Sequence, residues 1–285
     1  MNITFQLTLL VILLIQFHSN NAELYCRDEH GDNVDWYIVY KLPKISEPLL
    51  NSTFGEGLRY AYIAGPAIGA KNAIKEWQLS SKEVGDRNSI FAKTLRPVYK
   101  EPKKFTSLLY NDDPAEAESA KSYIDSANSY WAHAKGVVAM DSETGFFLTH
   151  SIPRFPLAFN ESKYEYPSSA SNYGQTALCI SFKTPSEANK ILRHLQTLQP
   201  NIYYSNDANV LKDKSVFNDV IGKVALNETL AIRTIKSYNG KLFTAFGKNS
   251  KADGDLYGAY IAPYLKNDLS VQTWRRGAGE PLPSN

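Results

Sequence analysis

The 285-residue sequence has no long hydrophobic run, little net charge and few cysteines. Its longest apolar stretch, Leu7 to Phe17, falls well short of the ~20 residues that a membrane-spanning helix needs. The net charge of +2 argues against a strongly basic nucleic-acid binder, so any site for a polyanion must be local. No low-complexity segment is present. The content of 43 % hydrophobic and 12 % aromatic residues predicts a folded globular protein of one or two domains.

The first 22 residues contain no charged side chain. An apolar core is followed by polar His18 to Asn21 and then by Ala22. This pattern is typical of a secretory signal peptide (residues 1–22) that is cleaved after Ala22, although no Lys or Arg precedes the core. The alternative is a membrane anchor, for which the apolar run is too short. We therefore expect a soluble, exported mature protein with no membrane anchor after signal cleavage.

Cysteine is scarce, because Cys26 and Cys179 are the only two. In an exported protein the default is one disulfide between them, and the alternative is two buried free thiols. Three Asn-x-Ser/Thr sequons also support export, since each can carry a glycan on a surface loop. Their acceptors are Asn51, Asn160 and Asn227.

Strand-like and helix-like segments alternate along the mature chain, which predicts the α/β class. Residue types and spacing predict strands at 34–42, 59–63 and 105–110 and helices at 67–82, 86–95 and 115–131. The helix at 86–95 is expected to end before Pro97. A buried strand carrying Cys179 follows. Thr184-Pro-Ser-Glu then reads as a capping box that begins a helix running to about Thr197.

The central feature of the sequence is a predicted β-hairpin. Apolar runs at 137–140 and 145–148 flank a short polar turn. His133 and Lys135 lie where the first strand begins and His150 where the second ends, so three basic groups converge at the open end. Two imidazoles and an ammonium group suit a bound phosphate and metal-free phosphoryl transfer. The alternative is that both histidines are ordinary surface or structural residues.

The segment after the hairpin, Ser151-Ile-Pro-Arg-Phe-Pro, contains two prolines that hold it extended. The loop therefore presents Arg154 in a fixed position, where it either contacts a phosphate or is a solvated loop arginine. His194 lies on the helix predicted after Thr184. We expect it to be solvated rather than catalytic.

Several blocks of the sequence are distinctive when taken together. They are CRDEHGDNVDWYIVYKLPK (26–44), LLYND (108–112), HAKGVV (133–138), HSIPRFP (150–156), YGQT (173–176), CISF (179–182), and KNSK (248–251) through DLY (255–257) to VQTW (271–274). In this order, from Cys26 to Asn285, they resemble the deoxyribonuclease II family. The VDW-x-x-x-YKLP block and the HSIP-x-FP loop are the most specific of them.

The resemblance implies a phospholipase D-like fold, with mixed β-sheets flanked by helices and two similar halves that each contribute a His-x-Lys motif. We expect a first half at 23–182 and an incomplete second half at 183–285. The resemblance further implies an acid endodeoxyribonuclease of lysosomes or secretions that needs no metal or other cofactor and leaves 3′-phosphate ends. In that mechanism one histidine attacks phosphorus and another protonates the departing 5′-oxygen. Cys26 and Cys179 match a family disulfide.

The site residues are carried over by position. His133 and Lys135 match the first His-x-Lys motif, and His150 matches a further histidine that the family needs. Arg154 and Lys251 are expected to bind the DNA substrate. The predicted location is secreted or lysosomal.

The chain departs from the family pattern in its last part. Family members carry a second His-x-Lys motif, typically within Asp-His-Ser-Lys-Trp, whereas no histidine follows His194 here. Three readings remain: a shortened form of an acid nuclease, a catalytically inactive secreted homologue that binds DNA, or a secreted glycoprotein that uses the scaffold for a protein partner. A homodimer could also pair two first motifs in one site.

Overall fold

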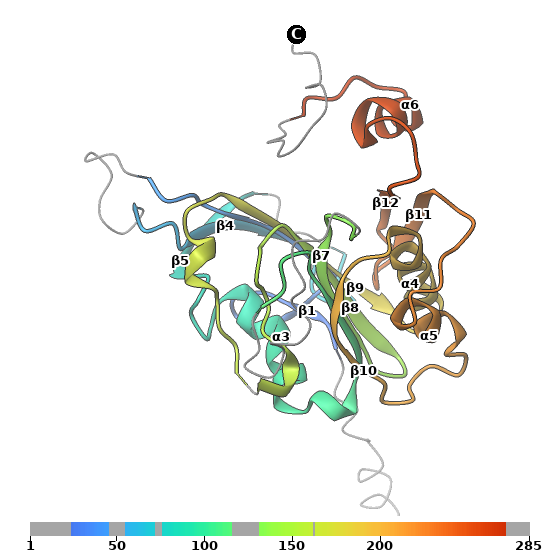
Figure 1. Cartoon of the computed structure of the whole chain (residues 1–285). Coiled ribbons are helices and arrows are strands. Elements are labelled where there is room, and N and C mark those ends of the chain that lie inside the picture. The colour runs from blue at the N-terminus through green and yellow to red at the C-terminus, as the bar shows by residue number, and fades with distance from the viewer. Residues whose placement is uncertain (1–23, 46–54, 72–75, 116–130, 162, 272–285) are drawn as a thin grey trace, which may run out of the picture.

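The central element of the structure is an eight-stranded sheet in which all neighbouring strands are antiparallel. The computed structural model describes residues 24–45, 55–71, 76–115, 131–161 and 163–271 (Figure 1). The strand order is β10-β6-β7-β8-β9-β3-β4-β5. The bounds are β3 Trp36–Lys41, β4 Arg59–Ala64, β5 Gln78–Glu83, β6 Thr106–Tyr110, β7 Lys135–Met140, β8 Thr144–His150, β9 Gln175–Lys183 and β10 Ile202–Asn206.

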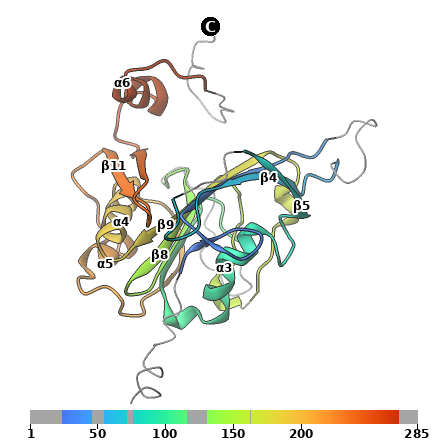
Figure 2. The ribbon, with the colours of Figure 1, turned by 180° about the vertical axis from the view of Figure 1, so that it is seen from behind.

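Helices cover both faces of this sheet, as Figure 1 and the reverse view in Figure 2 show. One face packs against α3, and the other packs against α4, α5 and the β11–β12 hairpin. The longer of these elements are α3 Ile90–Lys100, α4 Ser186–Leu198, α5 Ser215–Ile221, β11 Leu230–Lys236 and β12 Leu242–Lys248. The short ones are β1 Cys26–Arg27, β2 Asn33–Val34, η1 Pro102–Lys104, η2 Phe159–Glu161, η3 Ser168–Ala170, η4 Tyr257–Ile261 and α6 Ala262–Leu265. The predicted α/β class is confirmed, and the described sheet is antiparallel rather than mixed.

The side chains of β7 explain why both faces are covered. Val137 and Ala139 lie in the core on the side of α3, whereas Val138 and Met140 lie in the core on the side of α4. All four are fully buried. Because successive side chains of a strand point to opposite faces, a strand that is apolar at every position needs cover on both.

Two long-range ties hold the early part of the chain to the later part. The predicted disulfide is present between Cys26 and Cys179, which are 153 residues apart, and joins β1 to β9. Buried Asp35 accepts a hydrogen bond from Ser237 Oγ at 2.7 Å and another from Asn239 N at 2.7 Å. Asp35 therefore fixes the turn of the β11–β12 hairpin against the main sheet.

The helix predicted at 67–82 is wrong in the residues described there. Its last part belongs to β5, an edge strand whose backbone pairs with β4. The helix-like spacing misled because β5 buries only Ser80 fully, so its side chains carry no clear strand alternation. The helix predicted at 115–131 lies almost wholly outside the described residues.

The predicted bounds of two helices also need correction. The first helix continues past Pro97 to Lys100, because Pro97 removes only its own hydrogen bond and Val98 and Tyr99 after it pack into the core. The capping box at Thr184 is not formed, since the N-cap of α4 is Pro185 without a side-chain bond. Helix α4 itself is confirmed.

The boundary between two halves near residue 182 stays a prediction. Strand β10 comes after that boundary, yet it pairs with β6 in the main sheet. Helix α4, also later in the chain, packs on β9 and on β11. Among the described helices, none combines the length and apolar character that crossing a membrane requires.

Candidate functional site

The predicted hairpin is formed by β7 and β8, and its register places Lys135 directly opposite His150. Two residues before Lys135, His133 lies at the same open end. Gly136 follows Lys135, and a Cβ atom there would lie 2.3 Å from the hydroxyl oxygen of Tyr110 and 2.6 Å from the carbonyl oxygen of Leu148. Glycine is therefore required for β6 and β8 to approach β7 so closely at this end.

Asp112 joins the two residues of the His-x-Lys motif. It follows the end of β6, the neighbour of β7. Its Oδ2 lies 2.5 Å from His133 Nδ1, and its Oδ1 accepts a hydrogen bond from Lys135 Nζ. Burial alone would raise the pKa of Asp112, but hydrogen bonds and positive charge from His133 and Lys135 lower it to about 2. The carboxylate is therefore ionised in mildly acidic solution.

His133 and Lys135 differ strongly in exposure. The imidazole of His133 is 89 % exposed, whereas the side chain of Lys135 is 6 % exposed. Because Nδ1 of His133 faces Asp112, Nε2 is the ring nitrogen open to solvent. The site thus presents a free imidazole nitrogen beside a buried ammonium group.

His150 is buried next to Lys135, and its ring packs edge-on against Phe155 with centroids 5.5 Å apart. The backbone N–H of Ile152 donates to Nδ1 at 3.1 Å, so the neutral ring carries its hydrogen on Nε2. Nε2 is buried and has no hydrogen-bond partner among the described residues. Burial and the charge of Lys135 lower the pKa of His150 to about 3. His150 is therefore a neutral donor that lacks an acceptor.

Asn111 fixes the loop after β8 against the end of β6. Its buried amide donates to the carbonyl oxygens of Ile152 and Phe155, each at 3.1 Å. Arg154, between them, has a φ of 56°, and its Nε lies 3.3 Å from Asp113 Oδ1. The predicted fixed presentation of Arg154 therefore comes from Asn111 and Asp113 as well as from the prolines.

Charges at this end of the sheet balance at neutral pH. The positive charges of Lys135 and Arg154 are matched by the negative charges of Asp112 and Asp113. At neutral pH the cluster therefore offers a bound phosphate hydrogen-bond donors rather than a net positive charge. In the part of the chain that the structure describes, no group of three or more His, Cys, Asp or Glu side chains could hold a metal ion.

The structure brings together four of the five predicted site residues, and Lys251 is the fifth. Lys251 is exposed in the loop after β12, where its N–H donates to Asn249 Oδ1 at 2.9 Å. No hydrogen bond or ion pair of the described residues joins Lys251 to the cluster formed by Asp112, His133, Lys135 and His150. Of the sequon asparagines, Asn160 and Asn227 are exposed, and Asn51 lies outside the described residues.

His194 is not solvated, contrary to the expectation from sequence. It is buried on α4 beneath β12, where Gly247 lies against its ring. Burial and the charge of Arg233 lower its pKa to about 4. That Asp112 belongs to the site is not among the predictions made from the sequence. The pattern that could have indicated it is the pair of aspartates, Asp112 and Asp113, that follows the strand β6 beside the hairpin.

Asp112 makes a testable contribution to stability. Its pKa is depressed when folded, so this contribution is present above the unfolded value near 3.8 and is lost as the pH falls toward 2. We expect Asp112→Asn to unfold more easily than the wild type at pH 5 to 7, with a difference that shrinks between pH 4 and 2. Urea unfolding across this range measures it.

Asp113→Asn is the matched control. It removes one exposed ion pair and should change the free energy of unfolding by no more than about 1 kcal/mol. A deficit of Asp112→Asn that stayed constant down to pH 2 would contradict the assigned pKa.

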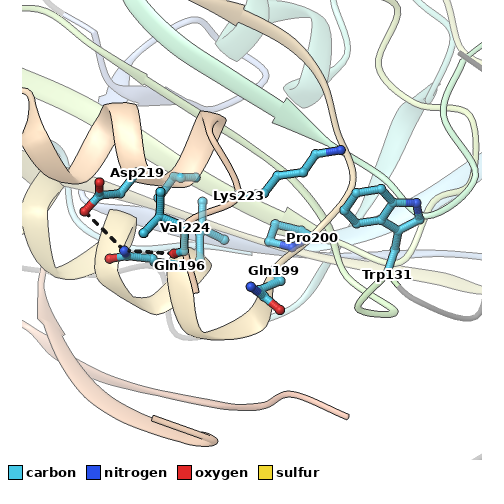
Figure 3. A pocket seen from close by; sticks show the side chains of 9 residues that line it. Trp131, Gln196, Gln199, Pro200, Asp219, Lys223 and Val224 are labelled. Carbon is cyan, nitrogen blue, oxygen red and sulfur yellow. Dashed lines mark hydrogen bonds between the residues drawn. The ribbon is translucent and has the colours of Figure 1, made fainter. Parts of the chain in front are cut away.

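A small pocket lies between the ends of α4 and α5 and the segment before β7 (Figure 3). Lys223 Nζ lies over the indole ring of Trp131, 4.1 Å from the ring centroid. Gln199 and Pro200 lie between the helices and Trp131.

The sequence matches the model of one protein family, deoxyribonuclease II, over residues 25–285. Among its relatives, deoxyribonuclease-2 of Caenorhabditis elegans is 31 % identical, over 96 % of this chain and 76 % of that protein. Deoxyribonuclease-2-alpha of Sus scrofa is 33 % identical, over 92 % of this chain and 68 % of that protein. Plancitoxin-1 of Acanthaster planci is 31 % identical, over 96 % of this chain and 74 % of that protein. The chain therefore belongs to the deoxyribonuclease II family and has a function of the deoxyribonuclease type.

Proposed function

We propose that this chain is an acid endodeoxyribonuclease that cleaves DNA phosphodiesters without a metal ion or other cofactor. The observation that carries the proposal is the double contact of Asp112. Its carboxylate binds both His133 and Lys135 and so holds the exposed imidazole beside the buried ammonium group. This combination offers a nucleophile and a fixed positive charge at one point. Both take part where a phosphoryl group is transferred through a covalent intermediate on the protein.

In the proposed reaction, Nε2 of His133 attacks phosphorus while Nδ1–H stays bonded to Asp112. The N–P bond forms as the bond from phosphorus to the 5′-oxygen breaks, which leaves a phosphohistidine on the 3′ side of the cut. Water then attacks phosphorus and the N–P bond breaks, so the product ends in a 3′-phosphate. Asp112 keeps His133 in one tautomer and stabilises the positive charge that develops on its ring.

Lys135 and His150 act on the phosphoryl oxygens in this proposal. Lys135 offers a charged donor, and His150 offers the Nε2–H that has no acceptor among the described residues. A phosphoryl oxygen would satisfy this buried donor. Arg154 at the rim is assigned to a flanking phosphate, and Lys251 remains a proposed contact for more distant DNA.

The departing 5′-oxygen needs a proton, which a protonated imidazole can give. Within one copy, His150 is the other imidazole at the site, and its pKa of about 3 makes it charged only in strong acid. In a homodimer, His133 of a second copy could fill this role. A rate per chain that rises with chain concentration supports the dimer, and a constant rate supports His150.

Export to a secreted or lysosomal location is part of the same proposal. The disulfide between Cys26 and Cys179 and the exposed sequons at Asn160 and Asn227 support an oxidising, glycosylating route. An acidic compartment also suits a reaction in which a protonated imidazole gives its proton to the departing 5′-oxygen.

The test is nicking of supercoiled plasmid by the purified chain at pH 5 and pH 7.5, with and without EDTA. We expect nicking at pH 5 that EDTA does not reduce, and much less nicking at pH 7.5, because the imidazole that gives a proton to the departing 5′-oxygen must be protonated beforehand. The 3′ ends should resist extension by a polymerase until a phosphatase is added. Loss of activity in EDTA contradicts the metal-free mechanism.

A second candidate is the catalytically inactive homologue that binds DNA. The same cluster favours it, since Lys135, His133 and Arg154 can hold phosphate without cleaving it. Salt-sensitive DNA binding at pH 5 without nicking would establish this reading. If the chain neither binds nor cleaves DNA, the remaining reading is a secreted glycoprotein that binds a protein partner.

A further inference from the structure

We propose that Trp131 and Lys223 form a subsite for one nucleotide of the DNA strand, next to the phosphate held by His133 and Lys135. The inference rests on the proposed function and adds to it a second place where the protein binds the DNA strand. The ligand is a nucleotide whose base stacks on the indole and whose phosphate contacts the ammonium group.

The position of the pair follows from the backbone. Trp131 precedes His133 by two residues, so their Cα atoms are at most about 7.6 Å apart. Ala132 N donates to the carbonyl oxygen of Gln199 at 3.5 Å, and Asn111 N donates to that of Asn201 at 2.9 Å. The turn after α4 therefore contacts both the segment that carries His133 and the segment that carries Asp112. The pocket that Trp131 lines is therefore close to the cluster along the backbone, although none of the cluster's residues lines the pocket.

The two side chains are arranged as nucleic-acid subsites require. Lys223 reaches from the end of α5 to place Nζ 4.1 Å from the centroid of the Trp131 ring, as Figure 3 shows. Lys223 is exposed and Trp131 is half-buried. Since the ammonium group lies over one face of the indole, the base in this proposal stacks on the opposite face. An aromatic ring with an exposed cation is the combination that holds single-stranded DNA, because every base can stack and every nucleotide has a phosphate.

Charge explains why this cation matters. Lys135 and Arg154 are each paired with an aspartate, whereas Lys223 is in none of the ion pairs that the described residues form. Asp219 lines the same pocket, but its Oδ2 accepts a hydrogen bond from Gln196 at 3.3 Å. Among the described residues, no carboxylate therefore forms an ion pair that cancels the positive charge of Lys223.

The experiment measures binding apart from cleavage. Fluorescence anisotropy of a labelled single-stranded oligonucleotide at pH 5 gives the dissociation constant of the full chain carrying His133→Ala, alone and with further changes. We expect Trp131→Ala and Lys223→Ala each to weaken binding about tenfold. Lys223→Ala should also reduce the slope of log affinity against log salt by roughly 0.7, which a purely structural loss would not do. Trp131→Phe should retain most of the affinity.

Trp77→Ala and Lys266→Ala are matched controls, because both side chains are exposed and lie outside the pocket. They should leave the affinity unchanged, and thermal melting verifies that every variant is folded. If the wild type nicks plasmid but the two pocket variants bind like the controls, the subsite is wrong and the proposed function stands. If the wild type neither binds nor nicks DNA, the proposed function itself is overturned.

Discussion

His133→Ala is expected to lower the rate of plasmid nicking at pH 5 by on the order of 10³-fold or more, because it removes the nucleophile of a group that acts jointly. The change should leave folding intact, since the imidazole is 89 % exposed and its interaction with Asp112 lies at the surface. Initial rates of nicking under single-turnover conditions measure the loss. The same variant should form no covalent adduct with a 5′-radiolabelled oligonucleotide, whereas the wild type quenched early should form one, because the phosphohistidine keeps the fragment that carries the 5′ end.

His30→Ala is the control for this experiment. His30 is also an exposed histidine, but it lies in the turn between β1 and β2 rather than at the open end of the hairpin. Its replacement should leave the rate unchanged. Nicking by His133→Ala at the wild-type rate would remove His133 from the mechanism, even if DNA binding persisted.

The hairpin at the centre of this site could be predicted because its information is local. Two apolar runs and a polar turn fix both strands and their register, and the register alone places Lys135 opposite His150. His133 and Lys135 are two residues apart, so their proximity requires no knowledge of the fold. The convergence of three basic groups therefore follows from a single short stretch of consecutive residues.

Asp112 could not be placed from the sequence because its role depends on pairing between distant segments. It lies 21 residues before His133 and 23 before Lys135, and it reaches them only because β6 pairs with β7. The burial of His194 has the same origin, since the β11–β12 hairpin that covers it comes far later in the chain. Charge partners and covering layers are set by tertiary contacts that local spacing does not encode.

Lys41 shows how a residue of the most distinctive sequence block supports the site from a distance. It is fully buried at the end of β3, and its Nζ donates to the carbonyl oxygens of Ala170, Ser171 and Tyr173 at 2.7, 2.6 and 2.5 Å. Burial lowers its pKa to about 8, so the amine is charged at neutral and acidic pH and has one hydrogen for each acceptor. The loop that it holds leads directly into β9.

That loop is coupled to the site through the start of β9. Gln175 accepts a hydrogen bond from the hydroxyl of Ser151, and Thr176 N donates to the same hydroxyl at 2.9 Å. Ser151 is the residue after His150. A change at Lys41 should therefore reach the position of His150 as well as the stability of the fold.

We expect Lys41→Met to lower the free energy of unfolding by about 3–5 kcal/mol, because it leaves the carbonyl oxygens of Ala170, Ser171 and Tyr173 without their charged donor while keeping the length of the side chain. Urea unfolding at pH 7 measures the loss. Lys44→Met is the matched control: Lys44 is 46 % exposed and forms an exposed ion pair with Glu56, so its replacement should cost no more than about 1 kcal/mol. If the two changes lower the free energy of unfolding equally, the three carbonyl oxygens find other donors in the absence of Lys41. The loop before β9 is then held by its own backbone and not by Lys41.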